Sequence, residues 1–175
     1  MATSPASASS KHILLIGMMG AGKSSVGKRL ADKLDLPFFD VDAWIEDEEG
    51  LSIAAIFDTR GESAFRDLEV RVLTSFLANP HASVLAVGGG AVTESRNRTV
   101  MSAQTCVWLR ASDATLVSRV GNGSDRPLLM GKDPATELAR LSKVREPMYT
   151  EVADVIVDVD ELTIDDVVDS VVAAL

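Results

Sequence analysis

The sequence predicts an α/β fold in which helices cover both faces of a parallel sheet. Short apolar runs alternate along the chain with longer segments of helical periodicity. The runs are nearly continuous in apolar residues, which is typical of parallel strands that are buried on both faces. Crossovers between such strands are right-handed, and ligands bind where the strands end. We therefore expect a functional site at the carboxyl edge of the sheet.

The expected elements follow one another in a regular order. The first apolar run leads into a glycine-rich loop, and an amphipathic helix follows that loop. Thr163 is an expected N-cap of the last helix, because its hydroxyl can accept a hydrogen bond from an amide of the first turn. The expected strands are 12–16, 38–41, 83–87, 105–109 and 154–159. The expected helices are 23–34, two or three between 43 and 77, then 94–103, 113–120, 134–149 and 164–173.

Length and composition indicate one globular domain. The 175 residues are enough to bury a core without disulfides or metals, and no apolar run is long enough to span a membrane. The net charge of −9 argues against a nucleic-acid surface, and Cys106 lies in an apolar run that is expected in the core. Residues 1–10 are small and polar, without a secretory or transit pattern. We expect them to form a disordered tail before a single domain at 11–175, in a cytoplasmic protein.

The glycine-rich loop is the clearest sign of a ligand. Gly17, Gly20, Gly22, Lys23 and Ser24 fit the pattern G-x-x-x-x-G-K-[ST], between an apolar strand and an amphipathic helix. Such a loop turns its backbone amides toward phosphate, while the lysine reaches the outer phosphates and the hydroxyl binds Mg²⁺. A plain glycine turn with a surface lysine is the disfavoured alternative. The expected nucleotide-binding residues here are Gly20, Ala21, Gly22, Lys23, Ser24 and Ser25.

Two carboxylates end the second predicted strand. Asp40 and Asp42 would lie at the sheet edge that receives the phosphates. One of them could hold Mg²⁺, directly or through water, and the other could accept a hydrogen bond, and also the proton, from an acceptor hydroxyl. Alternatively, Asp42 serves as the cap of the next helix, a role that is compatible with substrate contact.

Two further stretches are ambiguous when each is taken alone. Arg66 and Glu69 are three residues apart, so they share a helix face, where Glu69 could hold the guanidinium for a bidentate contact with a carboxylate. An ordinary surface ion pair is the alternative. Gly88, Gly89 and Gly90 end an apolar strand and could bring backbone amides close to a ligand. A flexible turn would explain them equally well.

The last stretch with possible chemistry is a polar loop. Residues 121–125 precede Arg126, so the loop could close over phosphates and bring an arginine to the transferred group. Arg145 stands near the end of a predicted helix and could supply a second cation to the acceptor. Each of these arginines, taken singly, is also typical of a solvated surface.

Together these stretches resemble the shikimate kinase family over residues 11 to about 158. The resemblance rests on GMMGAGKS, D-x-D at 40–42, R-G-E-x-x-F-R-x-x-E at 60–69, the triple glycine, R-P-L-L at 126–129 and R-x-P-x-Y at 145–149. It implies transfer of the ATP γ-phosphate to the 3-hydroxyl of shikimate, in the chorismate pathway to aromatic amino acids. It also implies a three-layer P-loop kinase fold whose five strands run in the order 2-3-1-4-5, with a shikimate-binding region at about 42–78 and a lid at about 120–132.

The resemblance assigns a role to each matching position. Arg66 and Arg145 would bind the shikimate carboxylate, Asp42 would bind the ring hydroxyls, and Gly88, Gly89 and Gly90 would adjoin the same molecule. Lys23 and Arg126 would stabilise the migrating phosphoryl group, with Arg119 beside the adenine. Ser24 and Asp40 would hold Mg²⁺, Asp40 through water. The expected partners are ATP and shikimate, with no nucleic acid or membrane, and the chain is expected to be a monomer.

Two other functions stay open at this point. A different small-molecule kinase of the same fold, such as a gluconate kinase, also phosphorylates a polyhydroxy carboxylate. A non-catalytic nucleotide-binding or regulatory protein would also keep the loop, although Lys23, Asp42 and Arg126 are all present. The residues do not decide whether Asp42 removes a proton or orients the hydroxyl, since a loose transition state needs little base.

Overall fold

Five parallel strands form one sheet in the order β2-β3-β1-β4-β5. The structure is a computed structural model, and it describes residues 11–121, 123 and 127–175. The expected tail at 1–10 and Arg126 therefore lie outside the described residues. The strands are β1 (Ile13–Ile16), β2 (Phe38–Asp40), β3 (Val84–Ala86), β4 (Thr105–Arg110) and β5 (Val155–Asp158). Both the α/β fold class and the strand order expected from the resemblance are confirmed.

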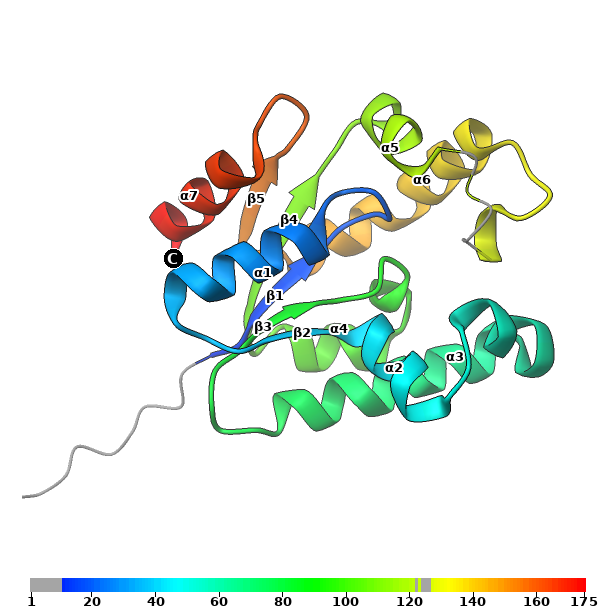
Figure 1. Ribbon diagram of the computed structural model, residues 1–175, viewed down its shortest axis with the longest axis horizontal. Coiled ribbons are helices and arrows are strands. Elements are labelled where there is room, and N and C mark those ends of the chain that lie inside the picture. Colours follow the sequence, from blue (N-terminus) through cyan, green and yellow to red (C-terminus); the bar gives the residue numbers. More distant parts are fainter. Residues whose placement is uncertain (1–10, 122, 124–126) are drawn as a thin grey trace, which may run out of the picture.

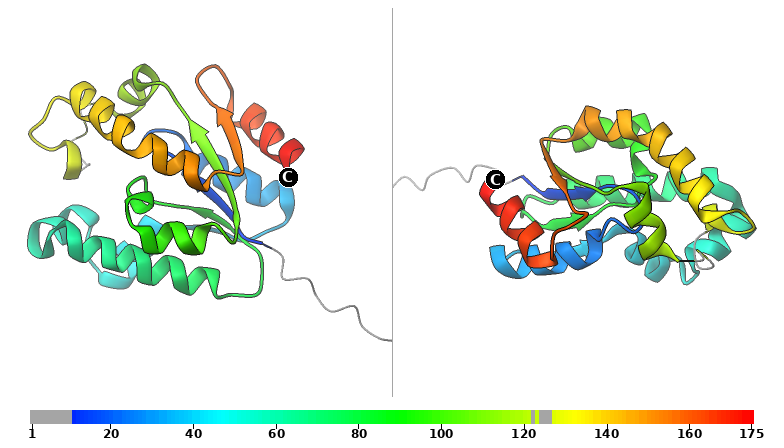
Figure 2. Two further views of the ribbon diagram at one scale, coloured as in Figure 1. Left: turned by 180° about the vertical axis from the view of Figure 1, so that it is seen from behind. Right: turned by 90° about the horizontal axis from the view of Figure 1, so that it is seen from above.

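The helices form a layer on each face of this sheet. One layer consists of α1 and α7, which pack against each other, and the other contains α3, α4 and α6, as the two opposite views show (Figures 1 and 2). The α-helices are α1 (Lys23–Leu34), α2 (Val41–Glu49), α3 (Ile53–Leu77), α4 (Ser95–Met101), α5 (Asp113–Val120), α6 (Pro134–Val152) and α7 (Ile164–Ala174). Two short 3-10 helices are η1 (Ala91–Thr93) and η2 (Pro127–Leu129).

Most expected boundaries agree with the structure to within a few residues. The bounds of α1 and α5 match, and Thr163 caps α7 in a capping box with Asp166. The expected end of α6 at 149 is wrong, because the helix continues through Pro147 to a buried Val152. The expected start of a helix at 94 is also wrong, since Glu94 has an extended backbone and α4 begins one residue later.

The junction between β2 and α2 corrects two expectations. The second strand ends at Asp40 rather than at residue 41, because Asp40 caps the helix that follows. Its Oδ1 accepts hydrogen bonds from the amides of Asp42 at 3.1 Å and Ala43 at 3.3 Å. The cap is therefore Asp40, and the alternative in which Asp42 caps the helix is wrong. The Asp42 side chain projects from the first turn of α2 and lines the cavity described below.

A bend divides α3 into two helical parts. Gly61 has φ 82° and ψ 167° inside this helix, a backbone conformation that glycine adopts far more readily than other residues. The two or three helices expected between 43 and 77 are therefore α2 and a bent α3. The bend leaves Phe57 and Phe65 on the same side of the helix, with their ring centroids 5.0 Å apart.

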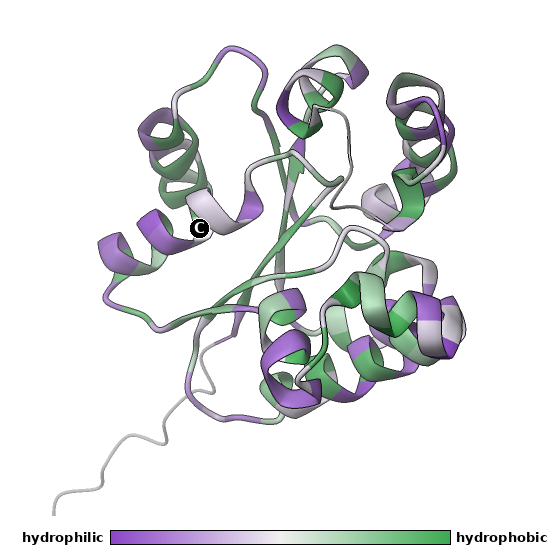
Figure 3. Cartoon of the chain, turned by 45° about the vertical axis from the view of Figure 1, so that its right-hand side comes forward, coloured by the Kyte–Doolittle hydropathy of each residue, from purple (hydrophilic) through white to green (hydrophobic). Residues whose placement is uncertain are grey.

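The core lies on both faces of the sheet, as expected for covered parallel strands. All four residues of β1 are buried, and the strands are predominantly hydrophobic along their length (Figure 3). Cys106 in β4 is fully buried, as expected. Within the described part of the chain, no helix combines the length and apolarity needed to cross a membrane. The adjacent strands β2, β3 and β1 end side by side, which places their following segments at one edge.

Candidate active site

A cavity of about 770 Å³ opens where β1, β2 and β3 end. Its floor is the loop between β1 and α1, and its walls come from α2, α3, the glycine turn after β3 and α6. The expected site residues among its lining are Gly20, Gly22, Lys23, Ser24, Ser25, Asp40, Asp42, Arg66, Gly88, Gly89, Gly90 and Arg145. The fold thus brings together segments that lie more than a hundred residues apart in the sequence.

The loop after β1 has the geometry of a phosphate-binding loop. Gly17, Gly20 and Gly22 all have positive φ, and Gly22 begins α1 without a side-chain cap. The first amides of α1 therefore face the cavity edge together with the positive end of the helix dipole. The ammonium of Lys23 donates to the carbonyl of Gly17 at 2.8 Å and to that of Met18 at 3.0 Å. This holds the cation against the loop that would receive phosphate.

Ser24 and Asp40 meet at the opening of the cavity. The Ser24 hydroxyl donates to Asp40 Oδ2 at 2.5 Å, while Oδ1 of the same carboxylate caps α2. A hydroxyl and a carboxylate are hard oxygen ligands of the kind that Mg²⁺ prefers, especially beside phosphate. The donor set fits Mg²⁺ in the position expected for it. Because Asp40 also starts α2, the same carboxylate connects this position to Asp42.

Arg66 and Glu69 form a buried pair rather than a surface ion pair. Their exposed fractions are 6% and 1%, and Arg66 Nη1 donates to Glu69 Oε2 at 2.5 Å. Arg66 Nη2 donates to Glu62 Oε1 at 3.0 Å. Arg66 Nε and Glu69 Oε1 have no hydrogen-bond partner among the described residues. The pair therefore keeps a buried donor and a buried acceptor at the cavity, which argues for a ligand there.

The electrostatics of this pair depend on its neighbours. The pKa of Glu69 is raised to about 7, chiefly by burial; the adjacent Asp42 carboxylate also raises it, and the Arg66 guanidinium opposes the shift. On α6, burial and the nearby Arg66 lower the pKa of Arg145, which is 3% exposed. Two guanidinium groups thus lie close together in a largely dehydrated place. An anion, such as a carboxylate, is the ligand that relieves their repulsion.

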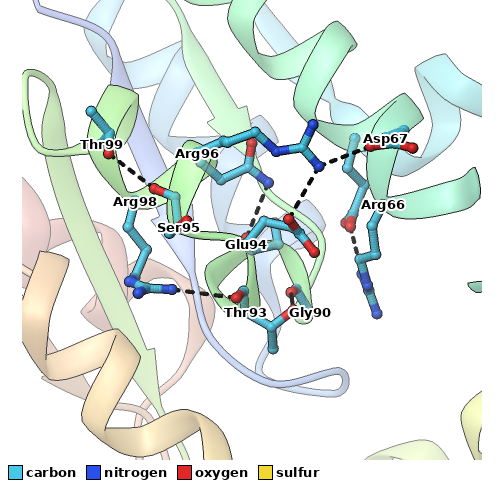
Figure 4. A network of polar contacts seen from close by, with 12 residues as sticks. Arg66, Asp67, Gly90, Thr93, Glu94, Ser95, Arg96, Arg98 and Thr99 are labelled. Atoms are coloured by element: carbon cyan, nitrogen blue, oxygen red, sulfur yellow. Dashed lines mark hydrogen bonds and ion pairs between the residues drawn. The ribbon is translucent and has the colours of Figure 1, made fainter. Parts of the chain in front are cut away.

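The glycine turn, Gly88 to Gly90, packs against the side chains of Asp42, Glu69 and Arg66. A Cβ on Gly88 would meet the carboxylates of Glu69 and Asp42, and one on Gly90 would overlap the guanidinium of Arg66. A Cβ on Gly89 would lie 3.1 Å from the carbonyl oxygen of Gly17 in the phosphate loop. The flexible-turn explanation is therefore insufficient, because the missing side chains make room for functional groups. Figure 4 shows Arg66 facing this turn.

Two expected residues among those that the structure describes, Ala21 and Arg119, do not line the cavity. Ala21 is a buried residue of the glycine-rich loop. Arg119 on α5 lies behind the loop, where Nη1 donates to the Gly20 carbonyl at 3.4 Å and Nη2 to that of Val159 at 3.2 Å. Arg126 falls outside the described residues, although Pro127 and Leu128, which follow it, do line the cavity.

Sequence reasoning missed several residues of the cavity wall. Glu46 stands four positions after Asp42 on α2, so helical spacing could have placed it on the same face. Phe57 also lines the cavity, but it lies before the bend at Gly61, and no spacing rule predicts its direction across such a bend. These residues add a carboxylate and an aromatic face to the cavity wall.

Comparison with known sequences agrees with this geometry. The sequence model of the family described as shikimate kinase matches residues 19–175. A shikimate kinase of Rhodopseudomonas palustris is 44% identical over 167 residues, which cover 94% of this chain and 81% of the relative. A shikimate kinase of Rhodococcus jostii is 39% identical, with 93% of this chain and 96% of the relative covered.

Comparison with solved structures gives the same result. A shikimate kinase from Acinetobacter baumannii, solved in complex with shikimate, matches with a TM-score of 0.89 and 35% identity, covering 93% of this chain and 91% of that one. A gluconokinase from Sinorhizobium meliloti matches with a TM-score of 0.61 but only 22% identity over 94% of this chain and 90% of that one, which shows a shared fold alone. From the family match and these relatives, the chain belongs to the shikimate kinase family.

Proposed function

We propose that this chain transfers the γ-phosphate of ATP to the 3-hydroxyl of shikimate, which gives shikimate 3-phosphate and ADP. The observation that carries the proposal is one cavity lined both by the lysine of the glycine-rich loop and by two buried arginines. This arrangement fits a phosphate donor facing an acceptor that bears a carboxylate. The related enzyme from Acinetobacter baumannii, solved with shikimate bound, supports the choice of acceptor.

On the nucleotide side, the residues from Gly20 to Ser25 surround the phosphates with backbone amides. Lys23 leaves the carbonyls of Gly17 and Met18 and follows the γ-phosphoryl group as its charge redistributes. Arg119 flanks the adenine, and Arg126 approaches the transferred group from the lid. Ser24 and Asp40 would hold Mg²⁺, Asp40 through water. When bound, this ion would offset the negative charge of the phosphates.

On the acceptor side, Arg66 and Arg145 bind the shikimate carboxylate and thereby set the orientation of the ring. Asp42 accepts a hydrogen bond from a ring hydroxyl, which aligns the attacking oxygen with the phosphorus. The new oxygen–phosphorus bond forms as the bond from the γ-phosphorus to the bridging oxygen breaks, and the hydroxyl proton leaves toward Asp42. The backbone of Gly88, Gly89 and Gly90 forms the wall beside the ring.

The remaining parts of the proposal concern organisation. The segment at about 42–78 forms the shikimate-binding region, and the segment at about 120–132 forms a lid that excludes water from the phosphates. Residues 11–175 act as a single domain in a cytoplasmic monomer that uses neither nucleic acid nor a membrane. The lining of the cavity by Pro127 and Leu128, which belong to the lid segment, supports its placement over the site.

Release of ADP from Mg-ATP tests the choice of acceptor. The purified protein is assayed with shikimate, with gluconate and without an acceptor. We expect turnover that depends on shikimate, with no increase on adding gluconate. Turnover with gluconate but not shikimate would keep the fold and overturn the acceptor. Nucleotide binding without turnover on either compound would overturn the proposed reaction.

A further inference from the structure

Tyr149 connects α6 to the glycine turn from outside the acceptor cavity. Its side chain is 1% exposed, and its ring stacks on that of Trp108 with centroids 5.4 Å apart. Its hydroxyl donates to the carbonyl oxygen of Gly89 at 2.6 Å. Tyr149 is the single tyrosine of the sequence, and it follows Arg145 by one helical turn. One turn of α6 therefore supplies both a guanidinium to the cavity and a hydroxyl to the turn behind it.

The three carbonyl groups of the glycine turn are held in different ways. The carbonyl of Gly88 accepts from the amide of Ala91, and that of Gly90 from the amide and hydroxyl of Thr93 (Figure 4). Both contacts are local, within three residues along the chain. The middle carbonyl, that of Gly89, receives its hydrogen bond from a different element, 60 residues away. Tyr149 thus fixes the centre of the turn relative to α6.

The centre of the turn lies between the two ends of the cavity. On one side Gly88 and Gly90 are in contact with the acceptor-side charges of Asp42, Glu69 and Arg66. On the other side Gly89 packs against the phosphate loop at Gly17 and Met19. Because these contacts are already at close-packing distances, a small rotation of the turn would move it into or away from these groups.

We infer that Tyr149 is a positioning residue for the acceptor: its hydroxyl holds the Gly89 carbonyl so that the turn and Arg145 form one rigid wall of the acceptor site. The inference rests on the proposed assignment of Arg66, Arg145 and the glycine turn to the acceptor. Burial raises the pKa of Tyr149, so the phenol stays protonated and remains a donor throughout the neutral range. A role in packing alone would require the ring and not the hydroxyl.

Tyr149→Phe separates these roles, because it keeps the ring against Trp108 and removes the hydroxyl, with its hydrogen bond to Gly89 and its contact with Arg145. We expect the KM for shikimate to rise about tenfold, the size of effect that one buried hydrogen bond carries. The kcat and the dissociation constant for Mg-ADP should stay within about twofold of wild type, because Lys23 and the phosphate loop keep their own contacts. A thermal melt checks that the variant is folded.

Ser83→Ala is the matched control. Ser83 is buried just before the start of β3, at the opposite end of that strand from the glycine turn, and its hydroxyl lies 2.8 Å from His12 Nδ1. This variant also loses one buried hydrogen bond, and should lower the melting temperature while leaving the KM for shikimate unchanged. If both variants lose stability and neither changes the KM, Tyr149 is merely structural and the inference is overturned.

Arg66→Ala, assayed in parallel, distinguishes failure of the inference from failure of the site. A raised shikimate KM in Arg66→Ala with a wild-type KM in Tyr149→Phe overturns the inference alone. A wild-type KM in both overturns the acceptor assignment as well. A second measurement leaves the hydroxyl in place: 3-fluorotyrosine, incorporated throughout, labels position 149 alone. Its ¹⁹F resonance should shift when shikimate saturates the protein, and an unchanged resonance would contradict the inference.

Discussion

The two ends of the cavity are built in different ways. The proposed phosphate end is one continuous segment, Gly17 to Ser25, and its donors are backbone amides, a lysine held on backbone carbonyls and two exposed serines. The proposed acceptor end is assembled from α2, α3, the glycine turn and α6, and its charged groups are buried against one another. The first end suits a ligand that every P-loop protein shares, whereas the second suits one particular molecule.

This difference has an energetic consequence. Backbone amides at a helix N-terminus cost little to leave in water, so the phosphate end need not be occupied to be stable. Buried Arg66, Arg145 and Glu69 have lost their hydration, and removal of one partner leaves the others uncompensated. Substitutions at the acceptor end should therefore affect binding of a single substrate, and those at the phosphate end should affect the reaction itself.

Lys23→Met should have the largest effect on kcat. Without the ammonium, the charge that develops on the transferred group loses a direct contact, so kcat should fall by roughly 10³-fold while the protein stays folded. Steady-state ADP release at saturating shikimate measures this. Lys28→Met, at an exposed position of the same helix, is the control and should keep wild-type kcat. A kcat within tenfold of wild type in Lys23→Met would remove the lysine from the mechanism.

Arg66→Ala should come next and should discriminate between the two ends. Loss of one carboxylate contact, in a place where Arg145 and Glu69 are left unbalanced, should weaken acceptor use by about 2–5 kcal/mol in kcat/KM. The dissociation constant for Mg-ADP, measured by calorimetry, should not change. Arg71→Ala, at another position of α3, removes an exposed ion pair with Glu48 of α2 and should alter neither constant. A collapse of nucleotide affinity in Arg66→Ala would mean that α3 does not belong to the acceptor side.

Gly90→Ala should produce a smaller effect of the same kind. A Cβ at this position overlaps the Arg66 guanidinium, so the arginine must move away from its paired position. We expect the shikimate KM to rise about tenfold, or about 1.4 kcal/mol. Gly50→Ala meets open space but has positive φ, so this control should lose some stability and keep its KM. Equal KM values for Gly90→Ala and wild type would show that the turn moves to accommodate the Cβ without displacing Arg66.

The last effect, that of pH, is on the free energy of unfolding and not on activity. The pKa of Glu69 in the folded protein, about 7, lies above its ordinary value of 4.5, so the folded state binds the proton more tightly than the unfolded state. The free energy of unfolding should therefore fall as pH rises from about 4.5 to about 7. Urea titrations across this range should show a shallower decrease in Glu69→Gln. Identical slopes in the two proteins would contradict the raised pKa.

The sequence alone predicts the phosphate end more fully than the acceptor end, for a physical reason. A loop of glycines before a helix is a local property, so Lys23 and Ser24 could be placed from their neighbours. The burial of Arg66 depends on α6 and on the glycine turn, which no local pattern reveals. Its spacing from Glu69 is equally typical of a surface pair, and the family resemblance was needed to choose. Likewise, the role of Asp40 as a cap and the bend at Gly61 depend on backbone angles that the sequence pattern did not reveal.

The most direct test of the account compares shikimate with its methyl ester in wild type and Arg66→Ala. The ester keeps the ring hydroxyls and removes the negative charge that the buried arginines are proposed to bind. The account predicts that wild type discriminates strongly between the two acceptors in kcat/KM, and that Arg66→Ala reduces this discrimination at least tenfold, since the missing charge and the missing guanidinium belong to one contact. The same ratio of acid to ester in both proteins would show that Arg66 does not bind the carboxylate, and would contradict the account.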